Sequence, residues 1–364
     1  MNNYLEQLAD RVVNYSLSVK KGQNVEIKYK NKEANDLVDL ICNKIKEKGA
    51  KPYTFLLSNE ERDIIMSNYN NEDIDALIKT DCYNYSFYDS FLSIGYNEKY
   101  KSIEKNNEEV IKRLKEERRK IQHLKANKNW LLFNYPSSVD ANNVGMSYDS
   151  FYKYAMNAMM YNFDNQFNAV NELKILLRNT NNIKIVGDNV NLTFNKNKIP
   201  AISLLGKVNL PDGEVYTSPL KDSATGYIKY NVPSPKENNI FNNVYLEFLN
   251  GKVVNAKSEC NEEMLNKIIN IDSGAKYIGE FAFGFNPMID KPMNDILYDE
   301  KMIGSFHIAL GNSYSNAFNG NKSSLHWDLI YLNENNNKCD IYFDNKLVYK
   351  KGNFILPKMK ELNR

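Results

Sequence analysis

The feature that most constrains the fold of this chain is a change in hydrophobic periodicity near residue 181. Upstream of it, apolar residues recur at helical spacing over 37–45, between a strand-like alternating stretch at 24–30 and a second expected strand at 53–57. Strand, helix and strand in this order predict a βαβ unit with parallel strands. The sequence therefore predicts an α/β domain with parallel strands over residues 1–200, followed by an α+β domain over 201–364.

Short strands follow one another in the second part of the chain. Asn250-Gly251 separates two strand-like segments, 244–249 and 253–256, and a type I′ turn favours this dipeptide because both of its central residues need positive φ. Asp344-Asn345 likewise separates two strand-like segments, 341–343 and 347–349. Both stretches predict β-hairpins.

The polar segments of the first part are expected to be solvated helices. Residues 98–125 are dense in Lys, Arg and Glu with one thin apolar stripe, and the interspersed acidic residues argue against a nucleic-acid surface. Ser58 is expected to cap a helix that begins over 59–62. His123 has no second potential ligand nearby, and no role is assigned to it.

Composition narrows the partners and the location. With 47 basic and 45 acidic residues the net charge is only +2, which gives no field that would attract nucleic acid or an anionic membrane. The N-terminus lacks the apolar core of a signal peptide, and no stretch of eighteen apolar residues occurs. The four cysteines have no C-x-x-C spacing, which argues against a disulfide framework or a cysteine zinc site. We expect a cytoplasmic protein with no nucleic-acid or membrane partner.

One short stretch, S-S-L-H-W-D-L-I at 323–330, carries the first candidate site. If its apolar alternation marks a strand, His326 and Asp328 point to the same face and Trp327 to the other. An imidazole and a carboxylate on one strand suit a divalent metal, or a carboxylate that bridges two. The alternative is a hydrogen-bonded histidine beside a surface aspartate.

Further candidate ligands lie in unusual segments of the second domain. Glu214 follows a P-D-G turn, Glu280 interrupts an apolar run, and Glu300 precedes His307 by seven residues. An excess of hard oxygen ligands over two imidazoles favours a pair of divalent ions such as Zn²⁺, Co²⁺ or Mn²⁺. In the alternative, Glu214 only caps a turn, and Glu280 and Glu300 pair with nearby lysines.

Five segments resemble, in this order, the signature segments of the thermophilic-type metallo-aminopeptidases, the family of aminopeptidases T and S. They are N-L-P-D-G-E-V-Y-T-S-P, Y-I-G-E-F-A, L-Y-D-E, F-H-I-A-L-G-N-S-Y and L-H-W-D. The resemblance implies metal ligands and an active-site hydroxyl at the matching positions. The implied ligands are Glu214, Glu280, Glu300, His307, His326 and Asp328, and the implied hydroxyl is that of Tyr314.

The resemblance also implies an activity. The expected protein is a metal-dependent aminopeptidase that releases N-terminal residues from short peptides by means of a water activated between two divalent ions. Glu214 is a proposed ligand that is also a candidate general base. Tyr314 is a candidate hydrogen-bond donor to the developing oxyanion. A homodimer is implied as well. The spacing from Tyr314 to His326 and from Glu280 to His307 differs from the family pattern, which leaves substrate preference open.

Two other classes of protein are alternatives. A non-catalytic α/β ligand-binding module with a structural metal site predicts a metal fully enclosed by protein groups. A nucleotide-binding enzyme would need a glycine-rich motif after a strand, and the sequence contains neither G-x-G-x-x-G in that context nor a P-loop lysine.

Overall fold

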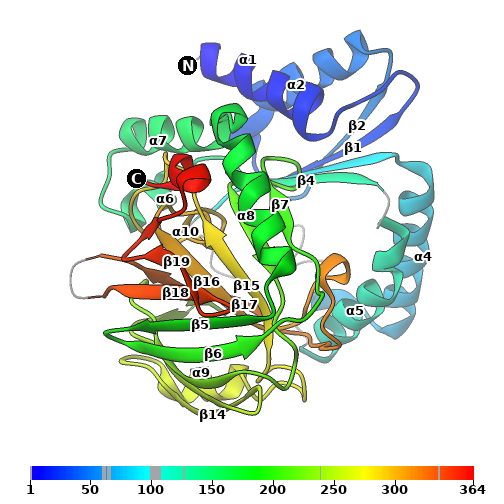
Figure 1. Ribbon diagram of the computed structural model, residues 1–364. Helices are drawn as coiled ribbons and strands as arrows, with labels where there is room; N and C mark the ends of the chain where they lie inside the picture. Colours follow the sequence, from blue (N-terminus) through cyan, green and yellow to red (C-terminus); the bar gives the residue numbers. More distant parts are fainter. Residues whose placement is uncertain are drawn as a thin grey trace. The chain divides into compact units, whose positions relative to one another are not determined.

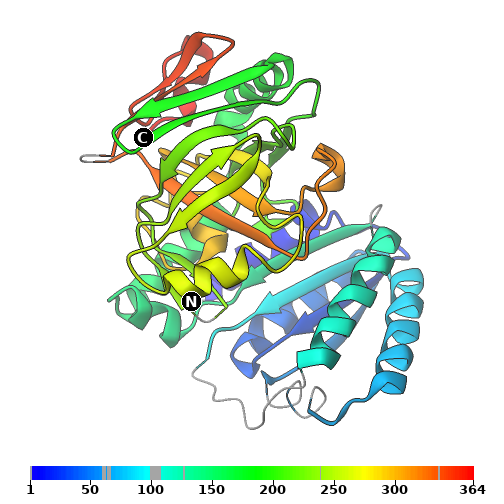
Figure 2. The ribbon, with the colours of Figure 1, turned by 90° about the horizontal axis from the view of Figure 1, so that it is seen from below.

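The computed structural model describes residues 2–59, 63, 67–98, 108–125, 128–237, 239–334 and 337–364 (Figures 1 and 2). These residues form two compact units. The first unit comprises residues 1–160 and 206–210, and the second comprises 161–205 and 211–364. Among the described residues, no helix combines the length and the apolar composition needed to cross a membrane.

The first unit is built on a five-stranded parallel sheet. Its strand order is β2-β1-β3-β4-β8, and every neighbouring pair is parallel. The strands are β1 (Asn24–Tyr29), β2 (Lys51–Leu56), β3 (Ser90–Gly95), β4 (Asn129–Asn134) and β8 (Asn209–Leu210). The α/β expectation for the first part of the chain is confirmed.

Helices connect these strands and begin at strong caps. Asn70 accepts from the backbone N–H groups of Glu72 and Asp73 at the start of α4, and Asp73 closes a capping box. Gly49 follows α2 with φ of 73°, as a C-terminal cap requires. The α-helices of this unit are α1 (Asn2–Asp10), α2 (Asn35–Glu47), α4 (Asn71–Phe87), α5 (Glu108–Ile121), α6 (Ser138–Asn143) and α7 (Tyr148–Met160).

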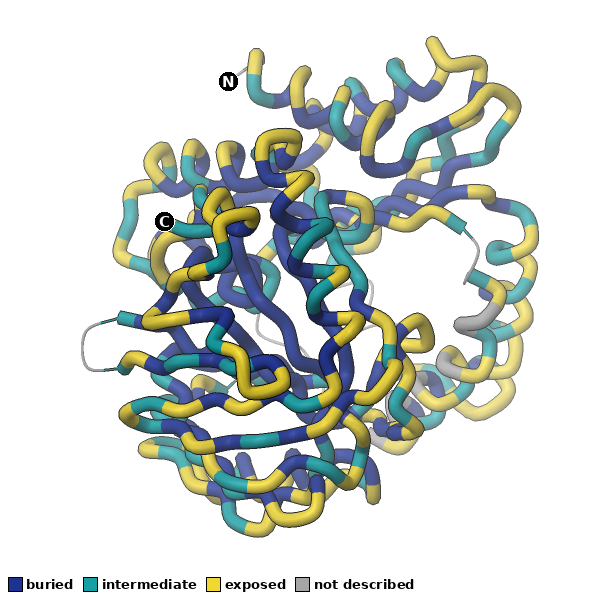
Figure 3. Tube along the Cα trace, in the orientation of Figure 1, coloured by how far each residue is buried: buried dark blue, intermediate teal, exposed yellow. Residues whose placement is uncertain are grey.

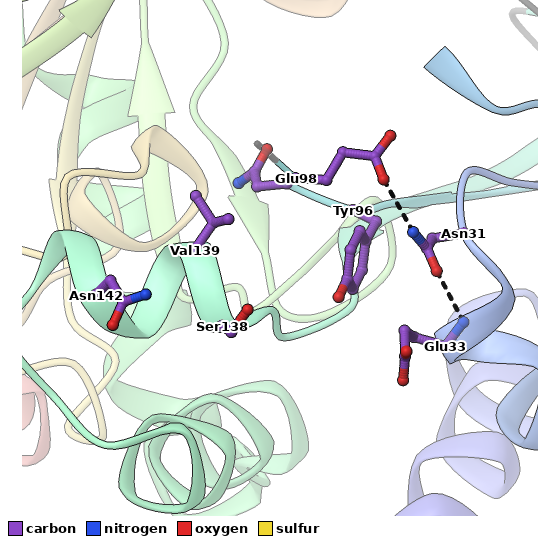
Figure 4. Close-up of a pocket in the computed structure, with 8 residues that line it drawn as sticks. Asn31, Glu33, Tyr96, Glu98, Ser138, Val139 and Asn142 are labelled. Carbon is purple, nitrogen blue, oxygen red and sulfur yellow. Dashed lines mark hydrogen bonds between the residues drawn. The ribbon is translucent and has the colours of Figure 1, made fainter. Parts of the chain in front are cut away.

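A cavity of about 320 Å³ lies beyond the carboxyl ends of β1, β3 and β4, where the strand order of the sheet reverses (Figure 4). Asn31 links the segment after β1 to the segment after β3, because its amide donates to Glu98, while its oxygen accepts from the backbone N–H of Glu33 within its own segment. None of the site residues predicted from the sequence is among its lining residues.

Two antiparallel sheets and one shared apolar core make up the second unit. The larger sheet has the order β14-β13-β10-β6-β5-β18-β19-β20, and the smaller sheet has the order β17-β16-β15-β9-β7. Phenylalanines join the two sheets through the core: the rings of Phe194 and Phe281 lie 5.2 Å apart, and those of Phe283 and Phe343 6.3 Å apart. Two strands of the smaller sheet, β15 (Ile278–Gly284) and β16 (Ser305–Gly311), are buried along their whole length (Figure 3).

The strands of the larger sheet are β5 (Asn182–Gly187), β6 (Val190–Asn195), β10 (Thr225–Lys229), β13 (Tyr245–Leu249), β14 (Lys252–Lys257), β18 (Cys339–Phe343), β19 (Lys346–Lys350) and β20 (Asn353–Phe354). Those of the smaller sheet are β7 (Ile202–Leu204), β9 (Glu214–Thr217), β15 (Ile278–Gly284), β16 (Ser305–Gly311) and β17 (His326–Leu332). The α-helices are α8 (Phe167–Asn179), α9 (Glu262–Ile268) and α10 (Ile296–Asp299), and a two-stranded ribbon pairs β11 (Ser234–Lys236) with β12 (Asn239–Phe241).

Both predicted hairpins form. Asn250 and Gly251 have φ of 51° and 80° between β13 and β14, and Asp344 and Asn345 have φ of 47° and 68° between β18 and β19. The α+β character of the second part is confirmed. The helix expected to start over 59–62 falls largely on residues outside the described part of the chain, as does the first portion of 98–125.

The compact units divide at Met160 and Tyr161, whereas the predicted domains meet at 200 and 201. The reason is packing, because α8, β5 and β6 bury Leu173, Ile183 and Leu192 in the core of the second unit. Residues 206–210 belong to the first unit because β8 pairs with β4.

Candidate metal centre

Strand pairing brings five of the six predicted ligands to one face of the smaller sheet. In β17, His326 and Asp328 lie opposite Gly311 and Ala309 of β16, and residues directly opposite each other share a face. Trp327 points to the opposite, core face. The predicted strand and its alternation are confirmed. His307 of β16 lies two residues from Ala309, so its side chain emerges on the same face.

Glu280 reaches this face through an irregularity in β15. Ile278 pairs with Leu310 and Glu280 with Ala309, so Gly279 is an extra residue in the ladder. The bulge lets Ile278 join the core while Glu280 joins the face of His307, although the two residues are only two positions apart. A Cβ on Gly279 would lie 2.3 Å from the carbonyl oxygen of Asn312, so glycine suits this position.

Glu214 and Glu300 complete the group. Glu214, at the start of β9, pairs with Gly284 of β15. Gly284 has no side chain, and this allows the backbone of Glu300 to approach, because a Cβ there would lie 2.7 Å from the Glu300 carbonyl oxygen. The other sheet positions of this face between the ligands hold small residues, Ala282 and Ala309, which leave room above the sheet.

Carboxylate oxygens surround the Nε2 atom of His307, which is fully buried. This nitrogen lies 3.3 Å from Oε1 of Glu280, 3.5 Å from Oε2 of Glu214 and 3.9 Å from Oδ1 of Asp328. Among the described residues, Glu280 forms ion pairs with the two histidines and not with a lysine, unlike the alternative considered from the sequence.

His326 lies at the solvent side of the group. Its Nδ1 is 2.9 Å from the backbone oxygen of Asn312, and donation to that carbonyl leaves Nε2 as the acceptor or ligand atom. Nε2 lies 3.4 Å from Oδ1 of Asp328 and 3.8 Å from Oε2 of Glu280. The side chain is 24% exposed, so the group of ligands is reachable from solvent at this end.

Tyr314 lies next to His326, with the two ring centres 4.8 Å apart. Although Tyr314 is 46% exposed as a whole residue, desolvation of its hydroxyl and the nearby carboxylates of Glu280 and Asp328 raise its pKa. The hydroxyl therefore keeps its proton at neutral pH and can donate a hydrogen bond.

Lys301 is a member of the group that the sequence reasoning missed. Its ammonium lies 2.6 Å from Oε1 of Glu214, 2.7 Å from Oε1 of Glu300 and 4.0 Å from Oδ1 of Asp212, and its side chain is 1% exposed. The expected alternative that Glu300 pairs with a lysine is thus realised. Two features of the sequence could have indicated this ion-pair group. Lys301 directly follows Glu300 in L-Y-D-E-K, and Asp212 lies two residues before Glu214.

The donor set fits divalent cations. The potential ligands form three triplets, and within each triplet the ligand atoms lie within 4.8 Å of one another. Any two of the triplets share one residue. They are Glu280–His326–Asp328, Glu214–Glu280–His307 and Glu300–His307–Asp328. Oε2 of Glu214, Oε2 of Glu280 and Oδ1 of Asp328 are buried acceptors without a hydrogen-bond donor among the described residues. Such acceptors are costly unless a cation satisfies them.

The pKa values reflect the same excess of negative charge. Burial raises the pKa of Glu214 to about 8, against the opposing charge of Lys301. Burial by itself would lower the pKa of both histidines, but the carboxylates raise it to about 9 for His307, which is hydrogen-bonded to Glu280, and to about 10 for His326, beside Asp328. In the metal-free protein, protons therefore supply positive charge to the group.

A pH dependence of stability follows for the metal-free protein. Between pH 6.5 and 8, His307, His326 and Glu214 keep protons that the unfolded chain has lost, since the ordinary pKa values are 6.5 for histidine and 4.5 for glutamate. Each proton retained makes the free energy of unfolding fall by at most about 1.4 kcal/mol per pH unit. We expect the melting temperature of chelator-stripped protein to decrease steadily across this window.

Thermal unfolding at half-unit steps of pH measures this slope. The window ends at 8 because Lys196, whose pKa burial lowers to about 8, acts in the opposite direction above that pH. A melting temperature that rises from pH 6.5 to 8 would contradict the assignment of these protons.

The fold and the group of ligands indicate a class of protein: one that presents carboxylates and imidazoles for divalent cations on one face of an antiparallel sheet. The family model of the thermophilic metalloproteases (M29) matches residues 1–354. The chain belongs to this family, which confirms the resemblance seen in its motifs.

Individual relatives agree with this membership. Aminopeptidase AmpS of Bacillus subtilis is 31% identical over 147 residues, which cover 38% of this chain and 35% of that protein. The match thus spans about a third of the length of that curated relative. The structure of wild-type AmpT from Thermus thermophilus has a TM-score of 0.76 at 19% identity and covers 98% of this chain and 100% of that one.

The fold is also found in a protein with a different name. The structure of 2,5-dihydroxypyridine dioxygenase from Pseudomonas putida KT2440 has a TM-score of 0.65 at 16% identity, with 99% of both chains covered. At these identities the two structural likenesses establish the fold alone. The reaction has to be argued from the residues of the site.

Proposed function

We propose that this chain is a metal-dependent aminopeptidase that releases N-terminal residues from short peptides with a free N-terminus. The observation that carries the proposal is the group of four carboxylates and two imidazoles, five of them on one sheet face and Glu300 beside it, within a chain of the M29 family. Its oxygen-rich donor set, without a cysteine, suits catalytic Zn²⁺, Co²⁺ or Mn²⁺.

We further propose that the centre holds two divalent ions, and the charge of the group supports this number. Asp212, Glu214, Glu280, Glu300 and Asp328 are five buried acidic residues, and Lys301 is the buried base among them. With all of these ionised and both imidazoles neutral, the group carries a charge of minus four. Two divalent ions neutralise it.

When bound, such a pair of ions lowers the pKa of a water molecule and polarises the scissile carbonyl of the peptide. The residues of the chain supply the rest. His307 and His326 would act as neutral ligands, and Glu280 and Asp328 would be shared between two ions, because each belongs to one triplet with His307 and one with His326. Glu214 is a proposed ligand that doubles as the general base, because its Oε2 has no hydrogen-bond donor among the described residues and lies 3.5 Å from Nε2 of His307.

Tyr314 is the proposed donor to the developing oxyanion. Its ring borders His326, the most exposed of the proposed ligands, and its hydroxyl remains protonated at neutral pH. A phenol at this position stabilises negative charge without adding a charge to the group. The alternative of a non-catalytic ligand-binding module with a structural metal is disfavoured by this solvent-facing side, because a structural site is closed by protein groups.

The family resemblance supports a homodimer, and we propose that the protein works in the cytoplasm. The catalytic proposal is tested by stripping the protein with a chelator and adding back Zn²⁺, Co²⁺ or Mn²⁺ before offering a panel of short peptides. We expect hydrolysis to be lost on stripping and restored by at least one ion. Stoichiometric metal binding without cleavage of any peptide would instead support the ligand-binding module.

A further inference from the structure

Lys301 lies at a position that no motif of the sequence assigns. It follows α10, and its side chain is buried beside the proposed ligands. Its ammonium bonds Oε1 of Glu214 and Oε1 of Glu300 at 2.6 and 2.7 Å, the length of charge-assisted hydrogen bonds. Lys301 therefore holds each of these two carboxylates through its Oε1 atom.

The second oxygen of Glu214 faces the other way. Oε2 has no hydrogen-bond donor among the described residues and lies 3.5 Å from Nε2 of His307. Glu300 also contributes one of its carboxylate oxygens to the triplet that includes His307 and Asp328. Holding one oxygen of a carboxylate so that the other faces an ion is how outer hydrogen bonds orient metal ligands.

The three triplets of ligands differ in their dependence on Lys301. The two that contain His307 each include one carboxylate bonded to Lys301, either Glu214 or Glu300. The third triplet, Glu280–His326–Asp328, contains neither partner of Lys301. An ion bound through His307 and an ion bound through His326 should therefore respond differently to a change at Lys301.

The geometry points to Lys301 as a positioning residue that prepares Glu214 and Glu300 for the ion bound through His307, while the ion bound through His326 is independent of it. This inference rests on the proposed pair of ions. It predicts that the affinity of only one of the two ion positions depends on Lys301.

The experiment is calorimetric titration of chelator-stripped protein with Zn²⁺, which measures binding without any peptide hydrolysis. We expect two binding steps in the parent protein. In Lys301→Met, the step that His307→Asn also removes should weaken by about 10- to 100-fold, the usual cost of losing an outer partner of a ligand. The step that His326→Asn removes should stay within about threefold. Lys301→Arg, which keeps the charge and offers two-pronged donation, should recover most of the loss.

A matched control is Lys196→Met. Lys196 is also fully buried in this unit, but its ammonium bonds backbone oxygens, with Ile199 at 2.8 Å. This variant should leave both steps unchanged, even if it lowers the melting temperature.

Each contrary outcome is distinct. Tighter binding in Lys301→Met would show that Lys301 only repels the ion, and an equal loss of both steps would show a merely structural role; either result overturns the inference. A single binding step in the parent protein would overturn it as well, since no second position would exist. Two normal steps without peptide cleavage would instead refute the proposed function and leave the role of Lys301 standing.

Discussion

Replacing Asp328 with asparagine is expected to reduce peptide hydrolysis by about a thousandfold or more. Asp328 belongs to two of the three ligand triplets and lies 3.4 Å from His326 and 3.9 Å from His307. The amide has nearly the same shape but lacks the charge that binds an ion. The Lewis-acid contribution of a bound ion is worth several kcal/mol, and each 1.4 kcal/mol corresponds to about a tenfold change in rate.

Turnover at saturating metal, together with the number of ions bound, measures the effect of this change. Asp222→Asn is a suitable control, because Asp222 is an exposed aspartate of the same unit outside the group. If Asp328→Asn bound two ions and kept more than a tenth of the parent activity, Asp328 would not be a shared ligand.

The second large effect is expected for Glu214→Gln. The glutamine keeps an oxygen for an ion but cannot accept a proton, and removal of a general base costs about 10² to 10⁴ in rate. Where Glu214 is ionised, as proposed for the metal-loaded protein, the loss of charge also weakens the contact with Lys301, so the free energy of unfolding should fall by about 1.5–3 kcal/mol, the usual contribution of a hydrogen bond to a charged group.

Single-turnover rates at full metal occupancy separate these two effects, because they report on the chemistry of the folded, loaded protein. Glu262→Gln, at the start of α9, serves as the surface control. Full turnover by Glu214→Gln with a normal metal content would assign the proton transfer to another residue.

Much of the site could be predicted because its residues lie on strands with clear alternation. The H-W-D-L-I residues lie in β17 with His326 and Asp328 on one face, since burial of Trp327 on the opposite face fixes the register. Whether the six predicted residues bind metal remains a prediction, but the structure brings all six together.

Other parts of the site depend on contacts that a pattern of residues does not contain. The extra residue at Gly279 reverses which face Glu280 joins, and no alternation in the sequence marks it. In the sequence, little distinguishes Lys301 from the other lysines. In the structure, its backbone packs closely against Gly284, and its ammonium lies beside Glu214. Both features arise from pairing between distant segments, for which local periodicity gives no information.

The division of the chain shows the same limit. Helix α8 (Phe167–Asn179) is not predicted from the sequence, and the contacts of Leu173 and Leu177 show that this helix packs in the core of the second unit. The two-residue strand β8 is equally invisible in the sequence, because its pairing with β4 is the only feature that defines it.

The most direct test of the aminopeptidase assignment is a comparison of one short peptide with its N-acetylated form, both offered to metal-restored protein. A free α-amine can ligate an ion of the centre, whereas an acetylated amine cannot. We expect cleavage of the free peptide only, with release of its N-terminal residue. Equal cleavage of both peptides, or cleavage at an internal bond, would contradict the assignment.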